Sequence, residues 1–352
     1  MRETVVFTHS GRLGDMVYAL PVVKAYAEAH DVRPVLVLSP LGRFLLPLLE
    51  RQSYLGPVLI SERYRDEKGE FGVQPFRVTL EGLDPGLAAG RVFHLGLRPD
   101  TPLEKMLNQH LTRTAADNLV REGGPDIEPD LARSFLEASP EIDQGVPTRH
   151  GSGIRMLYLE KPYVVFQPFG VSTLQYYLAP GGPGGRPDLD FLLNALTTRD
   201  FPSLAGIFTR KDLWKELLGG LGARVIMVGG RDDLNLCRQF FREIEGLRPA
   251  QPADGLALAR LIGGAAVFIG CQSVGAALAE GLKAPRLVDR VYGNALPFPG
   301  PEAPYFSLSG LARPWAVSSP AQADRKSLAQ GRDFIAAALR GDPGFRRGPG
   351  GA

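Results

Sequence analysis

The sequence has little cysteine and almost no net charge. Its two cysteines, Cys237 and Cys271, cannot form a disulfide framework and lack the spacing of a metal site, which fits a reducing compartment. The 40 basic and 38 acidic residues leave a net charge of +2, without the electrostatic footprint of a nucleic-acid-binding protein. We therefore expect a cytoplasmic protein that does not bind nucleic acid.

Long apolar runs are also missing. None approaches the roughly 18 residues that a membrane span needs, and the chain leads straight into a strand-like segment instead of a signal peptide. We expect no transmembrane segment, while peripheral contact with a membrane stays open. The length of 352 residues exceeds what one hydrophobic core usually supports, which predicts two domains.

A glycine-containing turn near the start of the chain predicts an anion site. Residues 10–15 (Ser-Gly-Arg-Leu-Gly-Asp) stand between an apolar run at 4–8 and a helical segment that extends to about residue 30. Strand, glycine turn and helix in this order open a nucleotide-binding unit, with the positive end of the helix aimed at the ligand. Asp15 at the rim could accept a proton from a bound hydroxyl. The alternative is that Asp15 only caps the helix.

Strand-like and helical segments alternate on both sides of a stretch rich in proline and glycine at 121–155. This alternation predicts parallel sheets covered by helices on both faces. A short helix is expected within the stretch, at 131–138. The predicted units are an N-terminal Rossmann-like domain at 1–155, a C-terminal one at 156–320, a terminal helix at 321–340 that could pack back across the domains, and a disordered tail at 341–352.

The residues Gly14-Asp15, followed by an apolar stretch and Leu20-Pro21, resemble the N-terminal signature of the ADP-heptose:lipopolysaccharide heptosyltransferases, glycosyltransferase family 9. The resemblance implies the GT-B fold, with two Rossmann-like domains facing a central cleft, and makes Asp15 the general base. It also implies a nucleotide diphosphate sugar as donor and a glycan or lipid-linked saccharide as acceptor. No metal and no cofactor are expected.

The C-terminal half carries the residues that this resemblance assigns to the donor. A strand ends in paired glycines at 229–230, and another runs into a helix of small residues whose N-cap would be Ser273. Glu280 resembles the acidic residue that binds the ribose hydroxyls in many GT-B proteins, although a solvated surface role is the alternative. The expected donor-binding residues are Ser10, Gly11, Gly14, Ser172, Lys211, Gly229, Gly230, Gln272, Ser273, Gly275 and Glu280.

Two departures from the family pattern leave the donor sugar open. Cys271-Gln272-Ser273 stands where heptosyltransferases carry Asp-Thr-Gly, and Gly275 stands where a histidine would fall. Residues 178–206, rich in glycine and proline, look like an insertion that is either a surface loop or a lid or acceptor-recognition element.

Three functions are compatible with these patterns. The first is an inverting, metal-independent glycosyltransferase. The second is a non-catalytic nucleotide-sugar or glycan-binding protein on a degenerate GT-B scaffold. The third, a dinucleotide-dependent oxidoreductase, is weakened because the first turn is not Gly-x-Gly-x-x-Gly and Ser39-Pro40 follows the second strand in place of an acidic residue.

Overall fold

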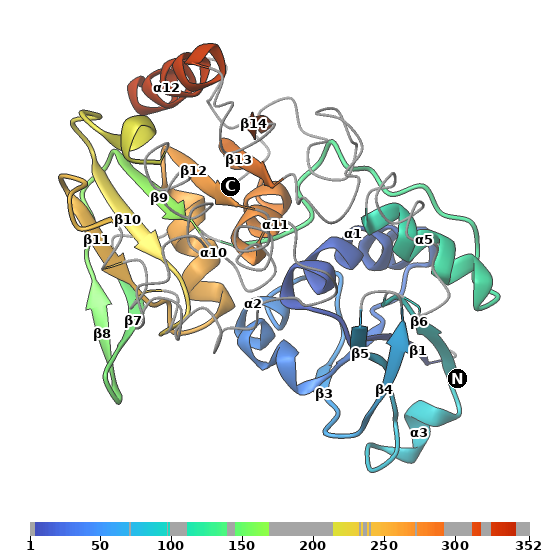
Figure 1. Ribbon diagram of the computed structural model, residues 1–352. Helices are drawn as coiled ribbons and strands as arrows, with labels where there is room; N and C mark the ends of the chain where they lie inside the picture. Colours follow the sequence, from blue (N-terminus) through green and yellow to red (C-terminus); the bar gives the residue numbers. More distant parts are fainter. Residues whose placement is uncertain are drawn as a thin grey trace.

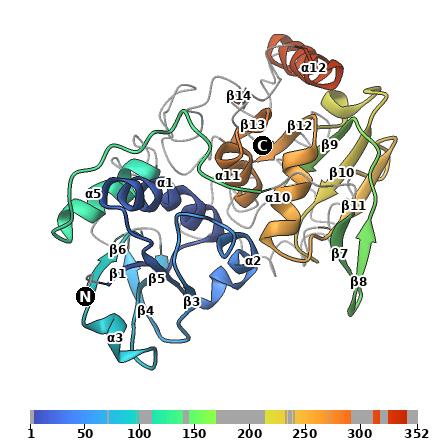
Figure 2. The same ribbon diagram turned by 180° about the vertical axis from the view of Figure 1, so that it is seen from behind.

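In a computed structural model of the protein, two parallel sheets are separated by helices that lie between them (Figure 1, and from behind in Figure 2). This arrangement confirms the α/β class predicted from the alternating segments. The structure describes residues 4–69, 72–96, 98, 111–138, 145–168, 214–231, 234, 238, 241–271, 273–291, 312–317 and 325–342.

The first sheet has the strand order β3-β2-β1-β6, and all of its strands are parallel. Its strands are β1 (Val5–His9), β2 (Val35–Leu38), β3 (Val58–Ile60) and β6 (Arg91–His94). The helices of this half are α1 (Leu13–His30), the 3-10 helix η1 (Pro40–Phe44), α2 (Leu46–Leu49), α3 (Pro85–Ala88) and α5 (Leu111–Arg121). An antiparallel hairpin of β4 (Tyr64–Gly69) and β5 (Gly72–Val78) stands beside the sheet.

The second sheet has the order β11-β10-β9-β12-β13-β14, again parallel throughout. Its strands are β9 (Tyr163–Gln167), β10 (Arg224–Val228), β11 (Leu247–Ala250), β12 (Val267–Cys271), β13 (Arg286–Val291) and β14 (Ala312–Val317). The helices are α10 (Gly255–Gly264), α11 (Val274–Gly281) and α12 (Arg325–Arg340). The central strands β9 and β12 are almost continuous apolar runs because helices cover both faces of the sheet.

One apolar core joins the two halves. It contains Phe7 of the first sheet, Leu20 of α1, Leu278 of α11 and Phe268 of the second sheet, all at most 1% exposed. The helices α1 and α11 pack against each other at its centre, as both views show. Because this burial is continuous, each half is stabilised by the presence of the other.

The far face of the second sheet has its own core, in which Phe166 contacts Trp214 and Phe241 with ring centroids 5.1 and 5.4 Å apart. Helix α12 joins this core through Phe334 and Ile335. The terminal helix is therefore present nearly where the sequence places it, and its described side chains pack on the second sheet.

A hairpin of β7 (Val146–His150) and β8 (Gly153–Leu157) spans the domain boundary expected at residue 155. Thr148 forms an antiparallel bridge with Pro252, so the hairpin attaches to the second half just beyond β11. Figure 1 shows it beside β11 at the edge of that sheet.

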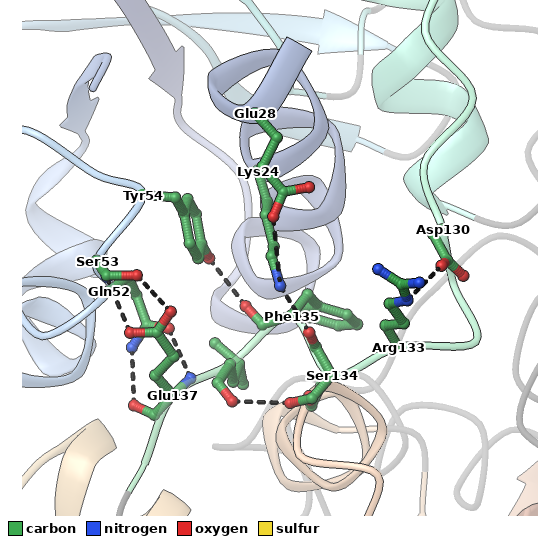
Figure 3. A network of polar contacts seen from close by, with 12 residues as sticks. Lys24, Glu28, Gln52, Ser53, Tyr54, Asp130, Arg133, Ser134, Phe135 and Glu137 are labelled. Carbon is green, nitrogen blue, oxygen red and sulfur yellow. Dashed lines mark hydrogen bonds and ion pairs between the residues drawn. The ribbon is translucent and has the colours of Figure 1, made fainter. Parts of the chain in front are cut away.

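The prediction of a helix at 131–138 is wrong, because residues 131–133 form a turn and residues 134–138 have no regular secondary structure. We call the segment 131–138 the strap. Its backbone bonds to both halves instead of to itself: Tyr54 Oη donates to the Phe135 carbonyl at 2.9 Å, and the amides of Phe135 and Leu136 donate to the Gly281 carbonyl of α11 at 3.1 and 3.2 Å. Figure 3 shows how the strap lies against Tyr54 and the other side chains of the first half.

Further polar contacts fix the strap to the first half. Lys24 Nζ donates to the Ser134 carbonyl at 2.9 Å, and Gln52 exchanges two hydrogen bonds with the Glu137 backbone at 3.1 and 2.8 Å (Figure 3).

Among the helices that the structure describes, none combines the length and apolar character that crossing a lipid bilayer would require.

Candidate active site

The two sheets place their functional turns by the same topological rule. The order of the second sheet is that of a doubly wound nucleotide-binding fold, with its reversal point between β9 and β12. In the first sheet the reversal falls between β1 and β6. Ligands of such sheets bind outside the carboxyl ends of the strands at the reversal point. The turns after β1 and β12, which the sequence predicts as site elements, both lie at these points.

The turn after β1 is closely packed around Gly11. His9 and Ser10 are 4% and 2% exposed, and His9 Nδ1 accepts a hydrogen bond from the Gly11 amide at 3.0 Å. A Cβ on Gly11 would stand 2.7 Å from His9 Cε1 and 3.3 Å from Asp15 Oδ2. A larger residue here would have to displace His9 or Asp15, since both side chains lie against the same face of Gly11.

Asp15 is half-buried in the first turn of α1. Burial raises its pKa to about 6, against the opposing effects of the nearby Arg12 charge and a hydrogen bond from the Arg12 backbone. That hydrogen bond is half of a capping box, so Asp15 contributes to capping the helix. A carboxylate whose pKa lies near neutrality is also suited to accept a proton during a reaction.

His9 is a residue that the sequence reasoning missed. Burial lowers its pKa to about 4, so the imidazole is neutral near pH 7. Because Nδ1 accepts the Gly11 amide, the ring proton is assigned to Nε2. The only sequence signal was its place as the last residue of a strand that enters a glycine turn.

Ser273 occupies the N-cap position of α11, but its hydroxyl does not cap the helix. Instead it donates to Oε1 of Gln167, the last residue of β9, at 2.7 Å. The first amides of a helix have no acceptor within the helix, so those of α11 keep their capacity to bind an anion. Gln167 is a second site residue that the sequence analysis did not predict. Its bond to Ser273 orients the turn after β12 across the reversal point.

The two turns face each other. A Cβ on Gly14 would stand 3.8 Å from the carbonyl oxygen of Ser273 and 3.8 Å from the amide nitrogen of Val274. The N-terminus of α1 therefore lies against the N-terminus of α11. Two positive helix ends in contact repel each other unless a negative group lies near them. In the first turns of both helices, Asp15 is the acidic residue that the structure places there.

Two predicted donor residues face the second sheet instead of this meeting point. Gly275 is buried, and a side chain there would clash with Gln167 Oε1 at 2.3 Å and with the Phe268 ring at 2.7 Å. Glu280 is fully buried and forms an ion pair with Arg286 of β13 at 3.5 Å. In this packing Gly275 allows α11 to approach the sheet, and a ribose would reach Glu280 only if its surroundings rearranged.

Gly229 and Gly230 follow β10 at the same edge of the second sheet, where Gly230 is exposed. Ser172, Lys211, Gln272 and the insertion at 178–206 lie outside the described residues. Among the described residues, no three side chains of histidine, cysteine, aspartate or glutamate gather into a group able to hold a metal ion.

Comparison with solved structures defines the class of fold. No protein-family model matches the sequence, and no curated protein matches it. Solved structures with the GT-B fold match nearly the whole chain, and the described part of this protein has that fold, as predicted.

The matching structures include members of glycosyltransferase family 9. One from Veillonella parvula is 13% identical, covers 95% of this chain and 97% of its own, and has a TM-score of 0.56. ADP-heptose LPS heptosyltransferase II of E. coli is 15% identical over 97% of this chain and 100% of its own, with a TM-score of 0.55. The E. coli heptosyltransferase WaaC, solved with ADP, is 12% identical over 95% of this chain and 99% of its own, with a TM-score of 0.50.

Proposed function

We propose that this protein is an inverting, metal-independent glycosyltransferase that uses a nucleotide diphosphate sugar. The observation that carries the proposal is the contact between the N-termini of α1 and α11 beside Asp15. Such a place favours a diphosphate, because helix amides and dipoles attract anions. The raised pKa of Asp15 gives the same place a base that is ionised near neutral pH.

In the reaction, Asp15 takes the proton of the acceptor hydroxyl while the oxygen attacks the anomeric carbon of the donor. The bond from that carbon to the diphosphate oxygen breaks on the opposite face, which inverts the configuration. The charge that develops on the departing diphosphate falls near the first amides of α11, which need no metal ion to stabilise it. The neutral His9 would hold the Gly11 turn, and so Asp15, in position.

The solved structures of similar fold support a donor class. Family 9 structures of the same fold include an ADP-heptose heptosyltransferase and one solved with ADP, which supports an ADP-sugar donor. We infer a glycan or lipid-linked saccharide as acceptor, and a cytoplasmic location where nucleotide sugars are available to the enzyme.

A second candidate is a nucleotide-sugar-binding protein without turnover. It is favoured by the Asp15 hydrogen bond from the Arg12 backbone, which gives this carboxylate a purely structural use. This candidate predicts that the wild-type chain binds the donor but transfers no sugar. A substitution at Asp15 then has no activity to remove.

The deciding experiment combines binding and turnover. The full chain is melted in EDTA with ADP, GDP, UDP, CDP and TDP, their sugar conjugates, and NAD(H), and donor hydrolysis or transfer is then measured. A ligand at one hundred times its Kd stabilises the folded state by about 2.7 kcal/mol. Asp15→Asn should keep this stabilisation and lose activity by roughly 100-fold or more.

The matched control is Asp31→Asn, an exposed aspartate at the other end of the same helix, which should change neither property. Stabilisation by NAD(H) alone would overturn the proposal. Donor binding without turnover in the wild-type chain would favour the binding protein.

A further inference from the structure

A pocket of about 480 Å³ opens at the carboxyl ends of β10 and β11, on the side of the second sheet away from β13 and β14. One wall is the β7–β8 hairpin, and the other carries Arg231, Leu234 and Arg238, which follow Gly230 in the sequence. We call it the arginine pocket, lined among others by Arg149, His150, Arg231, Leu234, Arg238 and Gln251.

The described lining of this pocket is basic. Three arginines and one histidine face it, and none of the described lining residues is an aspartate or glutamate, while Asp232 and Asp233 lie outside the described residues. Arg231 and Arg238 are exposed, and within the described part of the chain no acidic side chain forms an ion pair with either. Both line the pocket together with the buried Leu234, which lies between them in the sequence.

The third arginine is fixed to the opposite wall. The Arg149 amide donates to the Gln251 carbonyl at 2.7 Å, and its Nε donates to the Ala253 carbonyl at 3.2 Å. The Nε bond holds the exposed guanidinium of Arg149 across from those of Arg231 and Arg238. Guanidinium groups bind phosphate oxygens by paired, charge-assisted hydrogen bonds, and a preformed cluster loses less freedom on binding.

We propose that the arginine pocket binds a phosphate group carried by a substrate. The inference rests on the proposed function in one respect, namely that the donor diphosphate lies at Ser273. Strands lie about 4.8 Å apart, so the end of β10 is roughly 10 Å from the end of β12, with β9 between them. A phosphorylated nucleotide or sugar whose other end lies at Ser273 is long enough to reach Arg231, which directly follows the Gly229-Gly230 turn.

The phosphate has two possible sources, and the binding assay separates them. Calorimetric titrations of the full chain use pyrophosphate, ADP, adenosine and a hexose 6-phosphate at low and at physiological salt. Arg231→Gln and Arg238→Gln are each expected to raise the Kd for pyrophosphate roughly tenfold and to flatten its salt dependence. A similar loss of affinity for ADP assigns the pocket to the nucleotide. A loss of affinity for the hexose phosphate alone assigns it to a phosphorylated acceptor.

The control is Arg242→Gln, an exposed arginine four residues beyond Arg238 that does not line the pocket. It should bind every probe as the wild type does. Wild-type affinity for all of the phosphates in both pocket variants overturns this inference and leaves the proposed function standing. Phosphate binding that depends on Arg231 and Arg238, in a chain that shows no transfer activity, would support this inference and contradict the proposed function.

Discussion

Gly14 in the first turn of α1 lies against Ser273, so that a Cβ on the glycine would stand 3.8 Å from the Ser273 carbonyl oxygen. This is an ordinary van der Waals distance. Gly14→Ala should therefore fold, with a gain of about 0.5 to 1 kcal/mol from helix propensity, and a rise in its Kd for donor would support the predicted contact of Gly14 with the donor. Thermal unfolding and donor titration measure both effects.

Gly11→Ala is the contrasting change in the same turn. Its methyl group would stand 2.7 Å from His9 Cε1 and 3.3 Å from Asp15 Oδ2, so it must displace one of them. We expect a loss of stability of about 1 to 3 kcal/mol and a loss of activity greater than that of Gly14→Ala. Equal activity in the two variants would mean that the packing around Gly11 does not position Asp15.

The titrations of Asp15 and His9 affect folding in opposite directions. The pKa of Asp15 is raised to about 6 in the folded state, which therefore holds a proton that the unfolded chain releases, and stability falls as pH rises from about 4 to 6. The pKa of His9 is lowered to about 4, so the unfolded chain binds the extra proton and stability rises with pH from about 4 to 6.5.

Substitutions separate these two effects. Asp15→Asn should be more stable than the wild type by ~1 to 2 kcal/mol at pH 7, a value reduced for partial exposure, with the difference vanishing near pH 4. His9→Asn, which keeps an acceptor for the Gly11 amide, should show its largest deficit at pH 7 and a smaller one at pH 4.5. Urea unfolding of the wild type and both variants across this pH range measures the free energy of unfolding. The same pH dependence in all three chains would contradict these two pKa shifts.

Much of the candidate site could be predicted because it depends on local order. A strand, a glycine turn and a helix fix the place of Asp15 and Ser273 at the ends of β1 and β12, and short-range patterns show that order. The sequence could not show that the two turns touch, since this contact depends on how α1 packs against α11. The roles of His9 and Gln167 depend on the same close packing.

Glu280 and residues 131–138 show where local patterns mislead. Glu280 reads as a helix-surface carboxylate, yet Arg286, which follows it in the next strand, pairs with it inside the fold. The strap has helical composition, but its amides and carbonyls find partners in both halves, and those bonds replace the helical ones. Contacts between distant segments decide both cases.

The strap can be tested at Tyr54, whose hydroxyl donates to the Phe135 carbonyl. Tyr54→Phe leaves that buried carbonyl without this donor and should lower the free energy of unfolding by about 1 to 2 kcal/mol. Ser53→Ala is the control, because the Ser53 hydroxyl bonds to the exposed Glu137 carboxylate and should cost less than about 0.5 kcal/mol. Equal losses in denaturant unfolding would show that burial of the strap contributes little.

The ion pair of Glu280 and Arg286 is the remaining test. Both side chains are 1% exposed, and burial lowers the pKa of Arg286 while Glu280 opposes that shift. Glu280→Gln or Arg286→Met alone leaves one buried charge without its counterion and should cost about 3 to 5 kcal/mol. The double variant should lose clearly less than the two single losses combined, because neither charge remains. Additive losses in urea unfolding would instead show that the two side chains do not interact. A rise in donor Kd for Glu280→Gln at temperatures where it stays folded would point to the ribose contact predicted from the sequence.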